Sequence, residues 1–212
     1  MNELRMMAKF VIDGFMSPGA ITMWAILLIG FGILGMVIER VYYLYFKCGT
    51  NSGNFMAGIS KYMKSGDYEK AIKFASSEKT PLAKGVTAVL QNRGKGGKAV
   101  QRAVDEVFLT ETPKITRNIA FLPTLANLAT LLGLMGTIYG LMIAFDAIAN
   151  VPAAQRAQAL ATGISVAMST TLWGLLVAIP SLLAHGIVAG KSDGIVEELD
   201  EKTSKLINLV EE

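Results

Sequence analysis

Three long apolar blocks, separated by polar sequence, dominate the hydropathy pattern of the chain. They cover residues 20–46, 119–149 and 157–190. A helix that crosses the hydrocarbon core of a bilayer needs about 20 mainly apolar residues, so each block is long enough to be a transmembrane helix. The second and third blocks exceed this length and are expected to project beyond the membrane, at about 1.5 Å per residue. Their connection, residues 150–156, is so short that these two helices are expected to be antiparallel neighbours.

The remaining sequence predicts further helices. Apolar residues recur at helical spacing in residues 66–90, with an interruption at Pro81. The segment RGKGGK, residues 93–98, is predicted to be a turn, and a new helix is expected to run from Lys98 past Pro113 into the second block. Residues 1–19 suggest a short amphipathic helix on the outer membrane surface, and residues 191–212 suggest a solvated helix end. The pattern predicts an all-α integral membrane protein with three transmembrane helices, the long second and third extending into a cytoplasmic helical domain, residues 47–118.

Composition and charge support a membrane protein and indicate its orientation. Charged residues make up only 17% of the chain, below the ~25% that is typical of soluble domains. Thirteen of the twenty lysines and arginines lie in residues 47–117, and one lies in the 150–156 connection. By the positive-inside rule, the large polar segment and the C-terminus are expected in the cytoplasm, the 150–156 loop and the N-terminus in the periplasm, and the chain in the bacterial inner membrane. The dispersed net charge of +3 does not indicate a nucleic-acid partner.

Small and hydroxylated residues follow one face of the second and third blocks. A helical wheel at 100° per residue groups Thr130, Gly133, Thr137 and Gly140 in the second block, and Ala167, Thr171 and Gly174 in the third. Such stripes are the usual device for close helix packing in membranes, but facing hydroxyls can also line a narrow polar path. Both interpretations stay open. The candidate packing residues are Gly133, Gly136, Gly140, Gly174 and Pro180; the candidate ion-pathway residues are Thr137, Thr171, Thr130, Ser169 and Thr170.

Ionisable residues are almost absent from these blocks. Glu39 and Asp146 lie near block ends, where an interfacial position is expected, and Glu39 is followed by Arg40, which suggests an ion pair. His185 is expected to snorkel or to form a hydrogen bond rather than to relay protons. A protein that moves protons by itself usually needs ionisable groups within the membrane. The chain is therefore expected to use an acid supplied by a partner helix.

Two stretches of the chain resemble the transmembrane signatures of the MotA/TolQ/ExbB proton-channel family. They are LATLLGLMGTIYGLMIAF, residues 128–145, and GISVAMSTTLWGLLVAIPS, residues 163–181. Weaker similarity extends over IERVYYL, residues 38–44, and GDYEKAIKFASSEKTPLAK, residues 66–84. Three spans with a polar domain between the first two are similar to the TolQ/ExbB branch, whereas a flagellar stator of the MotA type would be expected to show four.

This resemblance implies a ring, typically a homopentamer, around a dimer of single-span partners that resemble ExbD or TolR. The partner supplies a membrane aspartate, and threonines of the second and third spans face it; Thr137 and Thr171 occupy those positions. A TonB-like or other envelope protein would receive the energy. The chain departs from its branch at Val166, which stands where the branch usually has a glutamate. Sodium is therefore kept as an alternative to the proton as the transported ion.

The expected function is a ring-forming subunit of an inner-membrane motor driven by the proton motive force, which transmits energy to the cell envelope or to outer-membrane transport. The alternatives are a sodium-driven motor subunit, a gliding or secretion motor subunit, and a passive membrane scaffold. The sequence contains no nucleophile–base set, metal-ligand cluster or nucleotide motif. Neither an enzymatic activity nor a cofactor is therefore predicted.

Overall fold

The chain folds almost entirely into helices. The computed structural model describes residue 15, residues 20–49 and residues 52–211. The elements in chain order are α2 (Ala20–Tyr42), η1 (Tyr43–Lys47), α3 (Ser52–Lys64), α4 (Tyr68–Ser77), α5 (Pro81–Asn92), α6 (Gly97–Thr116), α7 (Phe121–Asn150), η2 (Ala153–Gln155) and α8 (Arg156–Glu211). In this part of the chain three helical stretches, 20–64, 97–150 and 153–210, are long and apolar enough to cross a membrane, which confirms the predicted fold class. The amphipathic helix predicted for residues 1–19 lies outside the described residues, apart from Phe15.

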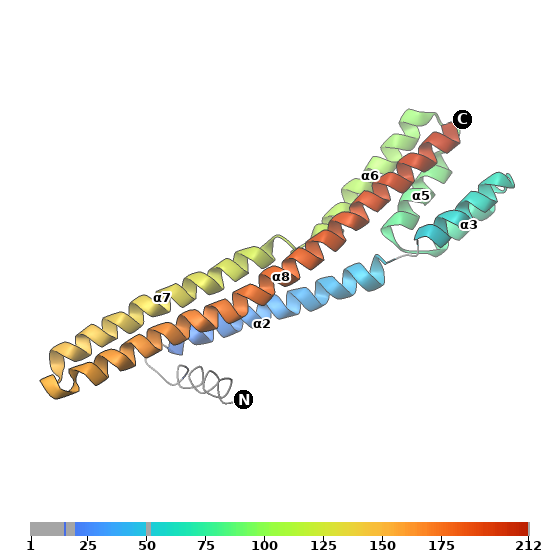
Figure 1. Ribbon diagram of the computed structural model, residues 1–212. Helices are drawn as coiled ribbons and strands as arrows, with labels where there is room; N and C mark the ends of the chain where they lie inside the picture. Colours follow the sequence, from blue (N-terminus) through green and yellow to red (C-terminus); the bar gives the residue numbers. More distant parts are fainter. Residues whose placement is uncertain (1–14, 16–19, 50–51, 212) are drawn as a thin grey trace. The chain divides into compact units, whose positions relative to one another are not determined.

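The chain divides into two compact units. The apolar unit comprises residues 1–37 and 120–186, and the polar unit comprises residues 38–119 and 187–212; α2 and α8 contribute to both. In the apolar unit α2, α7 and α8 lie side by side, and α7 runs antiparallel to α8 (Figure 1). α7 ends just before Pro152, because proline favours extended backbone at the residue before it. Val151 accordingly has φ −109° and ψ 154°, which ends α7.

Capping residues and glycines fix the helix ends of the polar unit. Asp67 caps α4 and Thr80 caps α5, and each side chain accepts a backbone N–H of the first turn at 3.4 Å. Pro81 occupies the first turn of α5, where its missing N–H costs no hydrogen bond. After α5, Gly94 and Gly96 have φ values of 79° and 90°, in the left-handed region that favours glycine. The turn predicted at residues 93–98 is therefore confirmed.

A turn at residues 117–120 separates α6 from α7. α6 passes through Pro113, as predicted, but it ends at Thr116. Asn118 then adopts φ 60°, a conformation in which asparagine is several-fold enriched among non-glycine residues. Pro123 falls in the first turn of α7, where no backbone N–H is needed. The prediction of one helix running from Lys98 into the second apolar block is therefore wrong.

The C-terminal segment is an integral part of the polar unit. α8 continues without interruption to Glu211, and its buried residues repeat every three or four positions: Val188, Ser192, Ile195, Leu199, Thr203 and Leu206. A Cβ atom on Gly85 of α5 would lie 2.7 Å from the Thr203 side chain, so α5 and α8 are in close contact here. Ser52 of α3 also donates a hydrogen bond to the carboxylate of Glu198. The predicted helix is present, but the prediction that this end is simply solvated is wrong, because only one face is exposed.

Two buried charged side chains connect α2, α5 and α6 within the polar unit. Arg40 is 2% exposed, forms the predicted ion pair with Glu39, and donates from Nη1 to the carbonyl of Lys114 at 3.1 Å. This carbonyl is in the last turn of α6, where helix carbonyls lack an intrahelical partner. Glu111 accepts hydrogen bonds from Lys84 Nζ at 3.0 Å and Lys114 Nζ at 2.7 Å. Burial raises the pKa of Glu111, but these two lysines outweigh it and hold the pKa below its usual value.

Replacing Glu111 by glutamine is expected to destabilise the polar unit by about 1–2 kcal/mol at pH 7, because two charge-assisted hydrogen bonds are weakened and the lysines are half exposed. A depressed native pKa stabilises the fold above the ordinary carboxyl pKa of 4.5, and this contribution is lost as the pH falls through the native pKa. Denaturant unfolding of the full chain, followed by circular dichroism, should show the difference at pH 7 and a smaller one in acid. Glu106→Gln, at an exposed position of the same helix, is the control; equal effects of the two variants would contradict the prediction.

Candidate functional site

The small residues of α7 and α8 pack directly against each other in the apolar unit. A Cβ atom on Gly140 would lie 2.9 Å from the backbone N of Ala167, and one on Gly174 would lie 2.7 Å from the carbonyl O of Ala129. Side chains essentially never approach so closely, so glycine is what lets the two backbones meet here. The residues in this contact are Ala129, Gly133, Gly136, Gly140 and Ala144 of α7, and Gly163, Ala167, Thr170 and Gly174 of α8.

Thr170 is enclosed between α7 and α8. Its side chain is 0% exposed, and a Cβ atom on Gly136 would lie 2.5 Å from its Oγ1. The hydroxyl donates to its own helix at Ala167 O, 2.8 Å away, and lies 3.3 Å from the carbonyl O of Gly133. Of the five candidate pathway residues, Thr170 is thus held inside the helix pair, where it fixes the distance between the two backbones.

Three other threonines, Thr130, Thr137 and Thr171, lie at the edge of this glycine contact; we call them the threonine edge. Thr171 is half-buried and donates to the carbonyl O of Gly133 at 3.4 Å. Thr137 lies one helical turn beyond Gly133 and is half-buried. Thr130 lies two turns before Thr137 and is exposed. Their hydroxyls donate to backbone carbonyls of the preceding turn at 2.6 and 3.2 Å. A threonine hydroxyl that donates its proton keeps lone pairs that can accept hydrogen bonds, so the edge presents acceptor oxygens beside the packed glycines.

Ser169 lies on a different side of α8. It is 2% exposed, and its hydroxyl donates to Ser165 O at 2.9 Å. Trp173, one turn further along the same face, lines an apolar groove of about 420 Å³ between α2 and α8. The structure therefore does not bring Ser169 together with Thr137 and Thr171.

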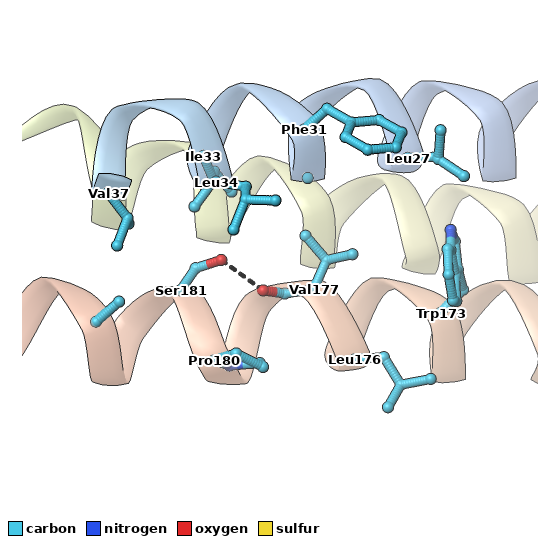
Figure 2. Close-up of a pocket in the computed structure, with 12 residues that line it drawn as sticks. Leu27, Phe31, Ile33, Leu34, Val37, Trp173, Leu176, Val177, Pro180 and Ser181 are labelled. Atoms are coloured by element: carbon cyan, nitrogen blue, oxygen red, sulfur yellow. Dashed lines mark hydrogen bonds between the residues drawn. The ribbon is translucent and has the colours of Figure 1, made fainter. Parts of the chain in front are cut away.

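The groove between α2 and α8 is lined mainly by apolar side chains (Figure 2). Side chains of Leu27, Phe31 and Leu34 on α2 lie opposite Trp173 and Val177 on α8. Its one hydroxyl, on Ser181, is already used, because it donates to the Val177 carbonyl at 2.5 Å. Pro180 also lines this groove, is exposed, and does not end α8; it is not part of the α7–α8 contact. A groove without charges or free hydroxyls is unsuited to ion passage.

The apolar unit supplies very little charge of its own. Val166 lines a hollow of about 210 Å³ between α7 and α8, together with small or apolar residues and Thr162. Asp146 is exposed near the end of α7, and it is the sole carboxylate among the described residues of this unit. His185 is half-buried in α8. The described residues contain no group of histidine, cysteine, aspartate and glutamate side chains that could hold a metal ion.

Two contacts were not predicted, and the sequence contains a recognisable pattern for the first of them only. Gly163 packs against the Cα and Cβ atoms of Ala144 so closely that no side chain fits. Gly163 and Ala167 are four residues apart, the spacing of small-xxx-small packing, which would have identified Gly163. The buried hydrogen bond between Arg40 and Lys114, by contrast, joins residues 74 positions apart, and no local pattern announces it.

The family model described as the MotA/TolQ/ExbB proton channel family matches residues 75–201, which is more than half of the chain and includes the whole α7–α8 contact. The chain belongs to the MotA/TolQ/ExbB proton channel family. This confirms the resemblance found in residues 128–145 and 163–181.

Individual relatives support the ExbB/TolQ branch of the MotA/TolQ/ExbB family. The putative biopolymer transport protein ExbB homolog of Methanothermobacter thermautotrophicus is 28% identical over 193 residues, 90% of this chain and 67% of the relative. The Tol-Pal system protein TolQ of Haemophilus influenzae is 31% identical over 51% of this chain and 49% of its own. The biopolymer transport protein ExbB of Helicobacter pylori is 34% identical over 40% of this chain and 57% of its own. The chain is therefore a multi-pass inner-membrane protein and an energy-transducing subunit of an ExbB/TolQ-type system, not an enzyme.

Proposed function

We propose that this chain forms a homo-oligomeric ring, a pentamer, in a motor driven by proton flow, together with single-span partners that resemble ExbD or TolR. The threonine edge is the observation that carries this proposal. It places acceptor oxygens of Thr137 and Thr171 beside the close-packed contact between α7 and α8, which holds these two helices together. A partner helix with a membrane aspartate would meet these hydroxyls. The motor would pass its energy to a TonB-like or other envelope protein, or to outer-membrane transport.

The proposed mechanism divides the work between the two proteins. The partner's carboxylate carries the proton, because Val166 and its neighbours in this chain offer no acid. A threonine hydroxyl that donates to a backbone carbonyl can accept from a protonated carboxyl, and when it turns away from that carbonyl it can donate to an ionised carboxylate. Thr137 and Thr171 can thus hold the partner's acid in both states as it passes from one subunit to the next. Thr170 and the glycines keep the positions of both hydroxyls constant.

The proposed orientation follows from charge. The polar unit, with most of the lysines and arginines, lies in the cytoplasm, and residues 150–156 and the N-terminus lie in the periplasm. Cysteine labelling of Ala154→Cys and Ser204→Cys, both at exposed positions, tests this with a membrane-impermeant reagent. Labelling at residue 154 alone in intact cells supports the orientation, and labelling at residue 204 alone refutes it.

The function is tested by producing the chain with the single-span membrane protein encoded nearest to its gene. Native mass spectrometry in mild detergent should give a ring of this chain that retains the partner. Proteoliposomes of the complex should take up protons under an imposed membrane potential, as reported by an enclosed pH-sensitive dye. A monomer without a partner would overturn the proposal. A ring without flux would show a passive scaffold, and flux that needs sodium would replace the proton as the ion.

A further inference from the structure

Two opposite charges at the α7–α8 connection, Asp146 and Arg156, have no counter-charge among the described residues of their own chain. Asp146 lies four residues before the end of α7, Arg156 is the first residue of α8, and both are exposed. Neither forms an ion pair with a residue in the described part of the chain. The guanidinium of Arg156 makes one long hydrogen bond, from Nε to the carbonyl of Val151 at 3.5 Å. Within the described residues of the apolar unit these are the sole carboxylate and the sole lysine or arginine.

The nearby helix ends do not compensate for these charges. The C-terminal end of a helix carries partial negative charge and the N-terminal end partial positive charge. Asp146 is near the C-terminal end of α7, and Arg156 is at the N-terminal end of α8. Each charge therefore has the same sign as its own helix end, and each is better placed against an opposite charge from outside the chain.

Asp146 also faces away from its own α8. It is nine residues from Thr137, which is about half a turn at 100° per residue. The opposite side of α7, with Gly140 and Ala144, packs on α8 of the same chain. The Asp146 side carries large apolar residues that are 43–62% exposed: Leu128, Met135, Tyr139 and Met142. A carboxylate on such a face is costly against lipid, whereas tyrosine and methionine are enriched at protein interfaces.

We propose that Asp146 of one copy of this chain forms an ion pair with Arg156 of the next copy. The inference rests on the ring assembly proposed above and identifies one of its contacts. In a ring, each subunit presents one surface to the neighbour on one side and a different surface to the neighbour on the other. Asp146 meets one neighbour and Arg156 meets the other, so that every charge is paired once the ring closes. An open chain of subunits would leave one unpaired charge at each end, so the ion pair favours closure.

Charge reversal tests this contact. Asp146→Arg or Arg156→Asp places like charges together, and we expect each to lower the fraction of ring in native mass spectrometry about tenfold. The double variant Asp146→Arg/Arg156→Asp restores the pair and should return the fraction to within about twofold of the wild type. Arg102→Glu, at an exposed position of α6, changes the net charge by the same amount as Arg156→Asp and should have no effect.

Disulfide formation provides a second readout. The variant Asp146→Cys/Arg156→Cys should give covalent dimers and larger oligomers on oxidation in native membranes, whereas each single cysteine variant should give none or dimers only. Cys48 is buried and common to all variants. A disulfide confined to one chain, or charge reversals whose effects only add, would overturn the pairing while the ring stands. A monomeric wild-type chain would instead overturn the ring itself.

Discussion

Replacing Gly140 by leucine is expected to force α7 away from α8 and to destabilise the apolar unit by about 3 kcal/mol. The added Cβ atom alone would lie 2.9 Å from the backbone N and 3.0 Å from the Cα atom of Ala167. These are backbone atoms of a helix, which cannot move aside as a flexible side chain can. In a chain of this size each 1 kcal/mol shifts the melting temperature by about 2–4 °C. The two tryptophans, Trp24 and Trp173, both lie in the apolar unit, so their fluorescence during heating of the detergent-solubilised chain reports this unit directly.

Gly32→Leu is the matched control for Gly140→Leu. A Cβ atom on Gly32 of α2 would meet nothing within 4 Å, so the same change adds the same apolar bulk without a clash. We expect its melting temperature to stay close to that of the wild type. If the proposed ring exists, Gly140→Leu should also lower its yield in native mass spectrometry, and Gly32→Leu should not. Equal melting temperatures for the two variants would mean that the α7–α8 contact is not close-packed.

The elements set by local chemistry were predictable from the sequence. Long apolar blocks have few alternatives to membrane-crossing helices, because every backbone polar group must be satisfied within lipid. Pro81 disfavours helical backbone at Thr80, and the glycines of residues 93–98 favour left-handed backbone, so both ends of α5 and the start of α6 were foreseen. The glycines at positions 133, 136, 140 and 174 lie where α7 and α8 approach closely, which is one of the two interpretations that the sequence left open; glycine in a helix costs about 1 kcal/mol relative to alanine, so its repeated use there needs a reason.

What depends on tertiary packing was not predictable in the same way. A helical wheel gives the angle of Thr170 to Thr171 but not which of them faces α7, and the structure buries Thr170 and leaves Thr171 at the edge. The break at residues 117–120 depends on Asn118, whose left-handed backbone has no strong local signature. The tail is different, because Ile195, Leu199 and Leu206 lie on one face of the helix and that signal was present. The acidic residues between them concealed this apolar face, which is buried because α5 packs against it.

Replacing Thr137 or Thr171 by valine is expected to leave the assembly intact and to reduce ion-driven proton uptake about tenfold or more. Valine keeps the shape of threonine but cannot hydrogen-bond a carboxylate. An unmade hydrogen bond in a water-poor site costs about 1–3 kcal/mol, and each 1.36 kcal/mol added to a barrier slows a step tenfold. One charge that crosses a membrane potential of 100 mV releases about 2.3 kcal/mol. The cost of one lost hydrogen bond is therefore comparable with the energy that one transported ion supplies. Thr171→Ser and Thr137→Ser keep the hydroxyl and should retain part of the activity.

Two controls separate a pathway role from a packing role. Thr124→Val changes a threonine on the same helix, exposed and three turns or more from Thr137, and should have no effect on uptake. Thr170→Val removes the enclosed hydroxyl, which lies between the two backbones, and should lower the melting temperature of the apolar unit more than the other threonine variants do. Melting temperature and uptake should therefore respond to different threonines: stability to Thr170, and flux to Thr137 and Thr171. If proteoliposomes with either Thr137→Val or Thr171→Val take up protons at the wild-type rate, that residue packs helices and contacts no carboxylate.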